Sequence, residues 1–119
     1  MTTDTSLLTA WANDSDFNTV FSRQIEAIGK SGDVLIAIST SGSSINIIEA
    51  VNNAKKNGII TIGFIGNQKC EIRNICDVTI SDPNDDTQRI QEGHIMIGHI
   101  ICEIVENKMC NLSSYNLEK

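Results

Sequence analysis

The sequence predicts an α/β fold in which helices cover a parallel sheet. Two apolar runs, residues 34–38 and 59–65, carry this prediction, because runs rich in isoleucine and valine are typical of strands buried on both faces. Between them, apolar residues recur at helical spacing in residues 45–56, and Asn57-Gly58 has the composition of a helix C-cap. Such a strand–helix–strand crossover is nearly always right-handed, with its two strands parallel.

The segment ahead of the first apolar run is predicted to be mostly helical. Residues 1–6 read as the end of a strand, since they are hydroxyl-rich and β-permissive, and residues 7–12 form either a turn or a short helix. Asn13-Asp14-Ser15 has the composition of a helix N-cap. The apolar residues between Phe17 and Ile28 mark one face of the helix that we expect to follow.

Further elements follow the second apolar run. Residues 70–75 fit a short helix, and residues 77–80 predict a weaker third strand nearer a sheet edge. After an acidic loop, a helix is predicted from about Thr87 to Lys108. Its apolar face is wide enough to indicate burial on two sides, so we expect it to contact another subunit. One domain then spans residues 1–109, and residues 110–119 are predicted to be a frayed tail.

The composition argues against several classes of function. The net charge is −6 and no basic cluster is present, so nucleic acid is not expected as a direct partner. There is no apolar run of about 18 residues and no signal-peptide pattern, so we expect no membrane span and a cytoplasmic location. The four cysteines lack C-x-x-C spacing, which argues against a zinc finger.

A loop rich in hydroxyl groups joins the first apolar run to the helix after it, and it reads Ser39-Thr40-Ser41-Gly42-Ser43-Ser44. Free N–H groups and the positive end of the helix dipole stabilise an anion at a helix N-terminus, above all a phosphate. Ligands of open α/β sheets also gather at the carboxyl ends of strands. The loop therefore predicts a phosphate site, with turn and N-cap serines as the alternative interpretation. It matches neither the nucleotide P-loop nor G-x-G-x-x-G.

The string D-V-L-I-x-I-S-T-S-G-x-S resembles the sugar-phosphate-binding motif of the sugar isomerase (SIS) domain. Within that superfamily the chain resembles the phosphoheptose isomerase family. Three further stretches agree with the family in the same order: Thr2 to Ser6, Asn13-Asp14 with residues 20–24, and residues 89–94 with His99. The resemblance implies a three-layer, flavodoxin-like parallel sheet.

The resemblance also implies an activity. It is the isomerisation of sedoheptulose 7-phosphate to D-glycero-D-manno-heptose 7-phosphate, a precursor for lipopolysaccharide, by a homo-oligomer that is a tetramer in the family. The alternative is a non-catalytic SIS protein that binds a sugar phosphate or has a regulatory role. One relative of these isomerases regulates replication initiation by binding the initiator protein. Gln91 and His99 favour the isomerase, because a pure binding module has no need of them.

Individual roles follow from the same resemblance. The phosphate would be held by four hydroxyl side chains, those of Ser39, Thr40, Ser41 and Ser44. Asn13 and Asp14 would contact the sugar chain. Gln91 and His99 would bind zinc and the sugar, and His99 would be the catalytic acid–base group, whereas His94 matches a family histidine without an assigned catalytic role. By spacing alone, Gln91 and His99 lie about 80° apart around a helix and about 12 Å apart along it.

The sequence departs from that family in one large way. Family members carry a long N-terminal part ahead of the position of Thr2, with a first strand, a glycine–serine loop, a glutamate base and a histidine ligand. No G-N-G-G-S motif and no H-x-x-x-E motif precede Ser39 here. The missing strand is the central neighbour of residues 34–38 in the flavodoxin-like order, so its loss leaves an unpaired edge and exposed apolar surface. Two zinc ligands are also fewer than the usual three. We therefore expect an SIS domain truncated at its N-terminus, without appreciable isomerase activity by itself.

Overall fold

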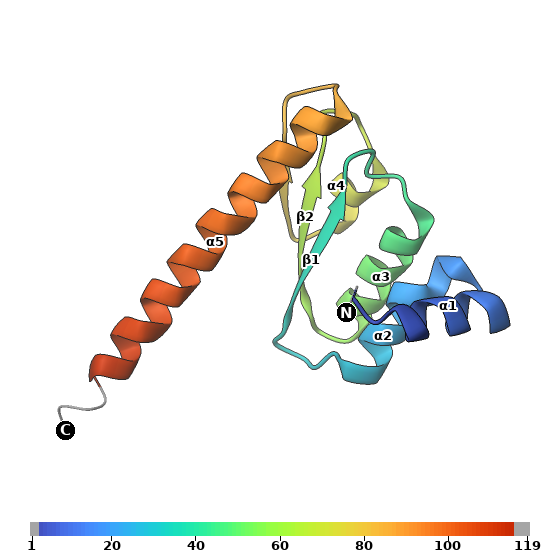
Figure 1. Cartoon of the computed structure of the whole chain (residues 1–119), viewed down its shortest axis with the longest axis horizontal. Coiled ribbons are helices and arrows are strands. Elements are labelled where there is room, and N and C mark those ends of the chain that lie inside the picture. The colour runs from blue at the N-terminus through green and yellow to red at the C-terminus, as the bar shows by residue number, and fades with distance from the viewer. Residues whose placement is uncertain (1–2, 116–119) are drawn as a thin grey trace.

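The computed structural model describes residues 3–115. They form three layers, with a parallel sheet between two layers of helices (Figure 1). The sheet has the strand order β1-β2-β3 and consists of β1 (Val34–Ser39), β2 (Ile60–Ile65) and β3 (Val78–Ser81). Both strand pairs are parallel. The register places Ser39 opposite Ile65, and Ile65 opposite Ser81, so all three strands end at the same edge of the sheet. The α/β fold predicted from the apolar runs is confirmed.

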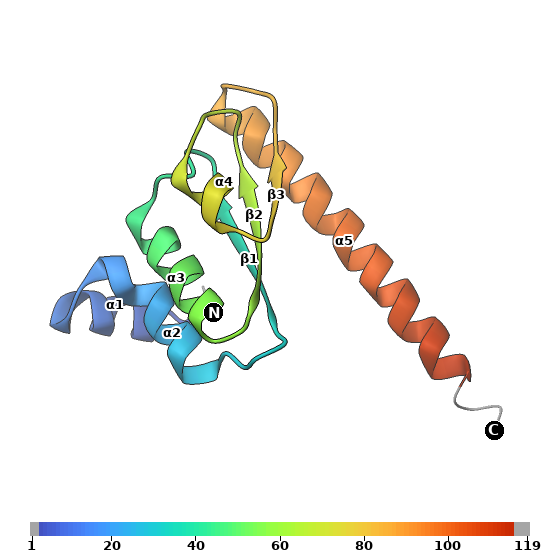
Figure 2. The same ribbon diagram turned by 180° about the vertical axis from the view of Figure 1, so that it is seen from behind.

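The helices form the two outer layers (Figures 1 and 2). One face of the sheet is covered by α2 (Val20–Ile28), α3 (Ile45–Lys56) and the short α4 (Glu71–Ile75). Outside α2 lie α1 (Thr5–Asp14) and the 3₁₀ helix η1 (Phe17–Thr19). The long α5 (Thr87–Tyr115) begins against the opposite face and then leaves the sheet.

The N-terminal segment differs from its prediction. Residues 1 and 2 lie outside the described part, and Thr5 already begins α1, because the Asp4 side chain caps that helix by accepting the Leu7 N–H at 3.0 Å. Asn13-Asp14-Ser15 ends α1 rather than starting the next helix. Asp16 has that capping role instead, at the start of η1. For residues 3–6 the predicted strand end was wrong, and so was the N-cap assignment at residues 13–15. Several Asp and Asn residues could cap, and spacing alone does not choose between them.

The C-terminal helix is longer than predicted. It continues to Tyr115, beyond the expected end at Lys108 and into the segment predicted to be a frayed tail. No glycine or proline follows Lys108, so the sequence holds no strong signal to stop the helix.

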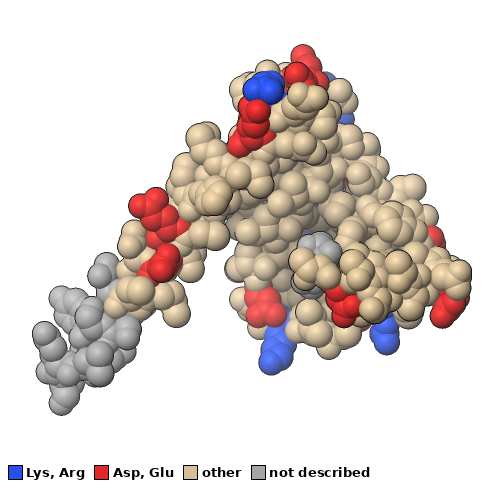
Figure 3. Space-filling view, in the orientation of Figure 1, with Lys and Arg blue, Asp and Glu red and all other residues tan. Residues whose placement is uncertain are grey.

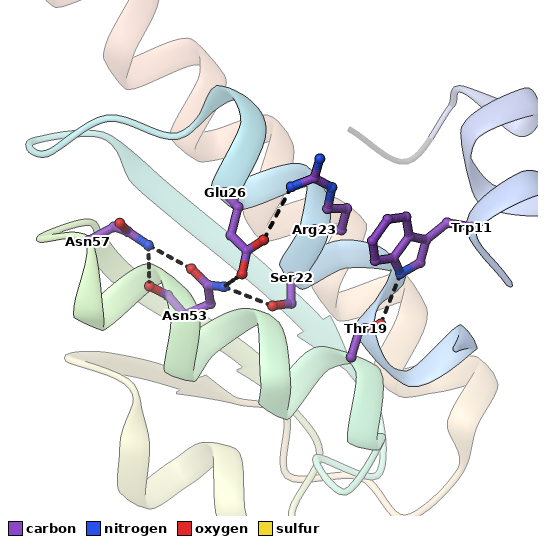
Figure 4. A network of polar contacts seen from close by, with 7 residues as sticks. All are labelled: Trp11, Thr19, Ser22, Arg23, Glu26, Asn53 and Asn57. Carbon is purple, nitrogen blue, oxygen red and sulfur yellow. Dashed lines mark hydrogen bonds and ion pairs between the residues drawn. The ribbon is translucent and has the colours of Figure 1, made fainter. Parts of the chain in front are cut away.

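The main core lies between the sheet and helices α2 and α3. One buried cluster joins Ile25 of α2 to Ala54 of α3 and to Ile59, and a second joins Ile48, Ile65 and Ile72. Burying such a side chain is worth about 1.5–3 kcal/mol. Beside the core, Asn53 Nδ2 donates to Ser22 Oγ and Glu26 Oε1, each at 2.9 Å, and so ties α3 to α2 (Figure 4).

The outer side of β1 is open. Val34, Ile36 and Ile38 are between 41% and 55% exposed, and within residues 3–115 no strand pairs with this edge. A groove of about 450 Å³ runs along the strand and is also lined by Phe21 and Ile47. Proteins normally cover such an edge. The unpaired edge and exposed apolar surface expected beside residues 34–38 are therefore both present.

Helix α5 projects from the body after its first turns (Figure 2). Ile90 and His94 are buried, whereas six large apolar side chains further along are at least 47% exposed: Ile95, Met96, Ile100, Ile104, Val105 and Met109. The radius of gyration is 16.2 Å, compared with about 14 Å for a compact chain of this length. Among the described helices, none is long and apolar enough to cross a bilayer.

Hydrogen bonds of Asp77 link the start of β3 to β2. Its Oδ2 accepts the N–H and the hydroxyl of the buried Thr61, each at 2.8 Å, and Lys55 Nζ lies 3.2 Å from Oδ1. These contacts lower the pKa of Asp77 to about 2. The backbone hydrogen bond from Thr61 is the largest cause, followed by the Thr61 hydroxyl and then Lys55. The folded state therefore favours the ionised carboxylate.

We expect acid to destabilise the fold partly through Asp77. Because its folded pKa of about 2 lies below its ordinary value of 3.8, its contribution is complete above about pH 4 and is lost as the pH falls toward 2. Urea unfolding of wild type and Asp77→Asn between pH 2 and 6 tests this, and the variant should show the shallower pH dependence. Lys55→Met should flatten the curve less, because Thr61 is the larger cause. Identical curves for Asp77→Asn and wild type would contradict the assignment.

Candidate functional site

The hydroxyl-rich loop bends at the carboxyl end of β1 and opens to solvent. Thr40 is half-buried, and Ser41 and Ser44 are exposed. Ser44 is the N-cap residue of α3, and its carbonyl accepts the N–H of Ile48 at 3.0 Å. Its side chain makes no capping hydrogen bond, so no cap side chain occupies the N–H groups of the first turn of α3. The predicted solvent-open bend leading into a helix is confirmed, and it has the geometry of an anion site.

The serines of the loop differ in their surroundings. Ser39 is buried, and its Oγ accepts the Gly42 N–H at 3.1 Å and lies 3.2 Å from Ser44 Oγ. Ser41 Oγ accepts the N–H of Ser43 at 3.3 Å from an exposed position. Ser39 therefore shapes the turn from inside, whereas the Ser41 and Ser44 hydroxyls lie where a ligand can reach them.

Position 42 requires glycine for two reasons, the backbone conformation and the lack of room for a side chain. Its φ of +62° lies in the left-handed region that favours glycine. A Cβ at this position would overlap the Sγ of Cys70, which packs behind the loop beside Ile48 and Ile65. The carbonyl of Gly42 also accepts the N–H of Ile72 at 3.4 Å. The loop is therefore supported from behind by the segment that follows β2.

A cavity of about 90 Å³ lies beside the loop. The loops after all three strands contribute to its lining, which consists of Thr40, Ser41, Asn67, Gln68, Asn84, Asp85, Thr87 and Ile90. Of these residues, only Thr40 and Ser41 were predicted to be site residues. The others follow strands whose carboxyl ends share one edge, so the general rule for parallel sheets could have found them.

The remaining predicted residues lie elsewhere. Asn13 and Asp14 are exposed at the end of α1, where Asn13 Nδ2 donates to Asp14 Oδ1 at 2.7 Å, and they do not line the cavity. Gln91 and His99 are exposed on α5. Gln91 borders a separate open hollow of about 510 Å³ that His99 does not line. The described chain thus brings Ser39, Thr40, Ser41 and Ser44 together in one loop beside the cavity, whereas Asn13, Asp14, Gln91 and His99 lie away from it.

The zinc site implied by the resemblance is incomplete in this chain. Between residues 3 and 115, no group of three or more His, Cys, Asp or Glu side chains could hold a metal ion. Gln91 and His99 supply two donors from one exposed helix, whereas catalytic zinc takes three protein ligands. The residues present do not fit a zinc ion by themselves.

His94, the other histidine, faces the sheet. It is 4% exposed, and its Nε2 lies 3.2 Å from the carbonyl oxygen of Ile65 at the end of β2. Its ring packs near Phe64, with the two ring centroids 5.7 Å apart. The two histidines of α5 therefore have different environments, as their spacing of five residues requires.

Comparison with known proteins connects this geometry to one family. A family model described as "SIS domain" matches residues 1–66. The phosphoheptose isomerase of Clostridium acetobutylicum is 53% identical over 109 residues, which are 92% of this chain and 56% of the relative. That of Burkholderia pseudomallei is 50% identical, over 92% of this chain and 55% of the relative. The chain thus spans about half the length of the curated relatives it matches.

Solved structures give the same result. A phosphoheptose isomerase from Neisseria gonorrhoeae superposes with a TM-score of 0.85 at 44% identity, over 88% of this chain and 59% of that one. A phosphoheptose isomerase from Francisella tularensis has a TM-score of 0.84 at 34% identity, over 87% and 56%. The fold of this chain is therefore similar to a little over half of each of these structures.

Replacing Gly42 tests how the loop is held. Gly42→Ala should lower the free energy of unfolding by about 1–3 kcal/mol, because alanine is strained at a positive φ and its Cβ meets Cys70. Cys70→Ala in the same chain should recover part of this loss by removing the overlap, but not the part caused by φ. Denaturant unfolding of the two single variants and the double variant measures both parts. Equal stability of Gly42→Ala and wild type would contradict the loop geometry.

Proposed function

Since the matched region is more than half of its residues, this chain belongs to the SIS-domain family, and we propose that it is the sugar-phosphate-binding part of a phosphoheptose isomerase. One observation carries the proposal. The loop from Thr40 to Ser44 presents hydroxyl groups and the start of α3 at the edge where all three strands end, beside an open polar cavity. That arrangement suits a phosphate ester whose carbon chain extends away from the helix.

The proposed substrate is sedoheptulose 7-phosphate. Its phosphate would accept hydrogen bonds from the hydroxyls of Thr40, Ser41 and Ser44 and from the first amides of α3, and Ser39 would hold the turn from behind. No lysine or arginine lines the cavity, so recognition of the dianion would depend on hydrogen bonds and the helix dipole. Hydroxyls of the sugar chain would form hydrogen bonds with the amide of Asn84 and the carboxylate of Asp85, which line the cavity.

The proposed reaction moves a proton between C1 and C2 of the sugar through an enediol(ate). A group with a pKa near neutrality suits this step, and we assign it to His99. Asn13 and Asp14 would contact the sugar chain. These residues lie outside the cavity lining of the described chain, so the reaction requires parts that complete the domain around the open edge of β1.

We propose zinc binding only for that completed domain. Gln91 and His99 would contribute two ligands, and the remaining ligands would come from outside the residues described here. The 119-residue chain is accordingly expected to bind sugar phosphate more readily than zinc.

A second candidate function is sugar-phosphate binding without turnover. The contrast between a well-formed phosphate loop and an incomplete metal set favours it for the chain in isolation. Both functions need the loop, and they differ in whether a completed domain converts the sugar.

Removing single hydroxyls tests the phosphate site. Ser41→Ala and Ser44→Ala should each weaken binding of sedoheptulose 7-phosphate by about tenfold to a hundredfold, because each removes one hydrogen bond to a charged group. Isothermal titration calorimetry measures the affinity, with inorganic phosphate as a second ligand. Ser6→Ala, on the exposed side of α1, is the matched control. Unchanged affinity in both loop variants would exclude this loop as the phosphate site.

Completing the domain tests the reaction. The part of the Clostridium acetobutylicum relative that this chain does not span, joined to it or co-expressed with it, should cover β1 and produce isomerase activity that the 119-residue chain lacks. His99→Gln in the completed domain should lower kcat by about 10²–10⁴-fold, because a proton-transfer group is lost. A coupled assay for the aldose product measures both. Turnover by the isolated chain would contradict the proposal, and tight binding without turnover by the completed domain would favour the second candidate.

We also propose that the chain assembles as a homo-oligomer through α5. The exposed apolar side chains of this helix are more than a monomer normally leaves in solvent. Figure 3 shows a largely uncharged surface between α5 and the body of the molecule. Burial of that surface against a copy of the chain would support the helix where it leaves the sheet.

Charge placed on this helix should disrupt the assembly. Ile100→Glu and Ile104→Glu are expected to raise the dissociation constant at least about tenfold, because each buries a charge in an apolar contact. Sedimentation velocity over a range of concentrations measures the association. Asn107→Glu adds the same charge at an exposed polar position of α5 and should have a smaller effect. A wild-type chain that remains monomeric at high micromolar concentration would rule out the proposed contact.

A further inference from the structure

We infer that His94 is a positioning residue that couples α5 to the phosphate-binding loop through the peptide group between Ile65 and Gly66. The structural part of this inference stands on hydrogen bonds and packing alone. Its consequence for ligand binding rests on the proposed function, because that part requires the loop to bind phosphate.

The first step is the state of the histidine ring. The carbonyl oxygen of Ile65 can only accept a hydrogen bond, so the Nε2 that lies 3.2 Å from it must carry the hydrogen and donate. Nδ1 is buried without a hydrogen-bond partner among the described residues. In the neutral ring, Nδ1 is then a bare acceptor. One specific tautomer of a deeply buried ring is therefore fixed by the end of β2.

The second step is the peptide group that receives this hydrogen bond. The carbonyl of Ile65 and the N–H of Gly66 belong to the same planar unit. Its oxygen accepts from His94 and also from the N–H of Asp82 at 2.9 Å, and its N–H donates to the carbonyl of Thr40 at 3.0 Å. If the loss of the His94 hydrogen bond let this peptide plane rotate, the Gly66 N–H would move and displace Thr40, which is the first residue of the solvent-open part of the loop. Hydrogen bonds linked in this way also polarise one another.

The third step is the packing that prevents the plane from turning freely. A Cβ on Gly66 would lie 2.6 Å from the carbonyl oxygen of Thr40 and 2.9 Å from Cδ1 of Ile90. Ile90 is buried and lies about one turn before His94 on α5. The helix therefore contacts the same peptide group with an apolar side chain and holds it with a polar one. Because Gly66 has no side chain, the helix α5, the strand β2 and the loop can approach one another closely at this residue.

The consequence concerns the orientation of α5. This helix carries Gln91 and His99 and leaves the sheet soon after His94, so its direction is set at its first turns. A ring that locks both the helix and the phosphate loop to one peptide plane fixes the proposed acid–base and zinc-binding residues relative to the bound phosphate. A histidine present only to fill the core would need no such link.

Two variants separate positioning from packing. His94→Gln keeps an N–H donor of similar reach, whereas His94→Phe keeps the ring volume and removes the donor. Both should lower the melting temperature, because each disturbs a buried site. Only His94→Phe should speed amide hydrogen exchange at Gly66, by about threefold to tenfold, and weaken inorganic phosphate binding by a similar factor. Both readouts come from NMR at a temperature where every variant is folded, and Asn107→Gln and Asn107→Phe provide a matched control pair at an exposed polar position of α5.

The outcomes are distinct. Equal Gly66 exchange in His94→Gln and His94→Phe would overturn the inference and leave His94 as a core residue. If the wild-type chain binds no phosphate, the proposed function fails, and Gly66 exchange still decides whether His94 fixes the loop. If neither variant folds, nitrogen chemical shifts of the wild-type ring decide, because the inference requires the Nε2–H tautomer and is overturned by Nδ1–H.

Discussion

The hydrogen bond from the Gly66 N–H to the Thr40 carbonyl is the contact on which the rest of the candidate site depends. Parallel pairing of β1 with β2 brings Ser39 level with Ile65, so the chain leaves both strands at the same height. The hydrogen bond then holds the two departing loops together, and the cavity forms beside them. A polar ligand site at this edge is a general consequence of parallel strands, because their connections all turn outward at their carboxyl ends. In this protein that edge carries hydroxyl side chains and the start of α3, the groups on which the proposed phosphate site depends.

The open edge of β1 belongs to a chain that matches only part of each relative and of each solved structure. The relatives and solved structures that match this chain are roughly one and a half times its length, and the chain superposes on little more than half of each structure. The surface that is exposed in this chain includes the groove beside Phe21 and the outward-facing isoleucines of β1. The hydroxyl-rich loop is supported by β1, β2 and the segment around Cys70.

Much of the fold followed from local pattern. Strands β1 and β2, helix α3 and the bend between them agree with prediction to within a residue or two, because an apolar run and a helical repeat leave few alternatives over so short a segment. The first 16 residues were predicted less well. Asp4, Asp14 and Asp16 are all chemically able to cap a helix, and in the structure Asp4 and Asp16 do so. The far end of α5 was also missed, since helix length there is not marked by any stop signal.

The sequence by itself determined the order of the elements and the chemistry of the loop, because strand periodicity, glycine conformation and hydroxyl composition are local properties of the chain. Only the tertiary structure decided which side chains share a site. Asn67, Asn84 and Asp85 meet Thr40 and Ser41 only when three strands stop at one edge, and His94 acquires its contact with the Ile65–Gly66 peptide only when α5 docks there. The physical reason is that these contacts join residues far apart along the chain, and their positions are fixed by strand register and helix docking rather than by any residue's own preference.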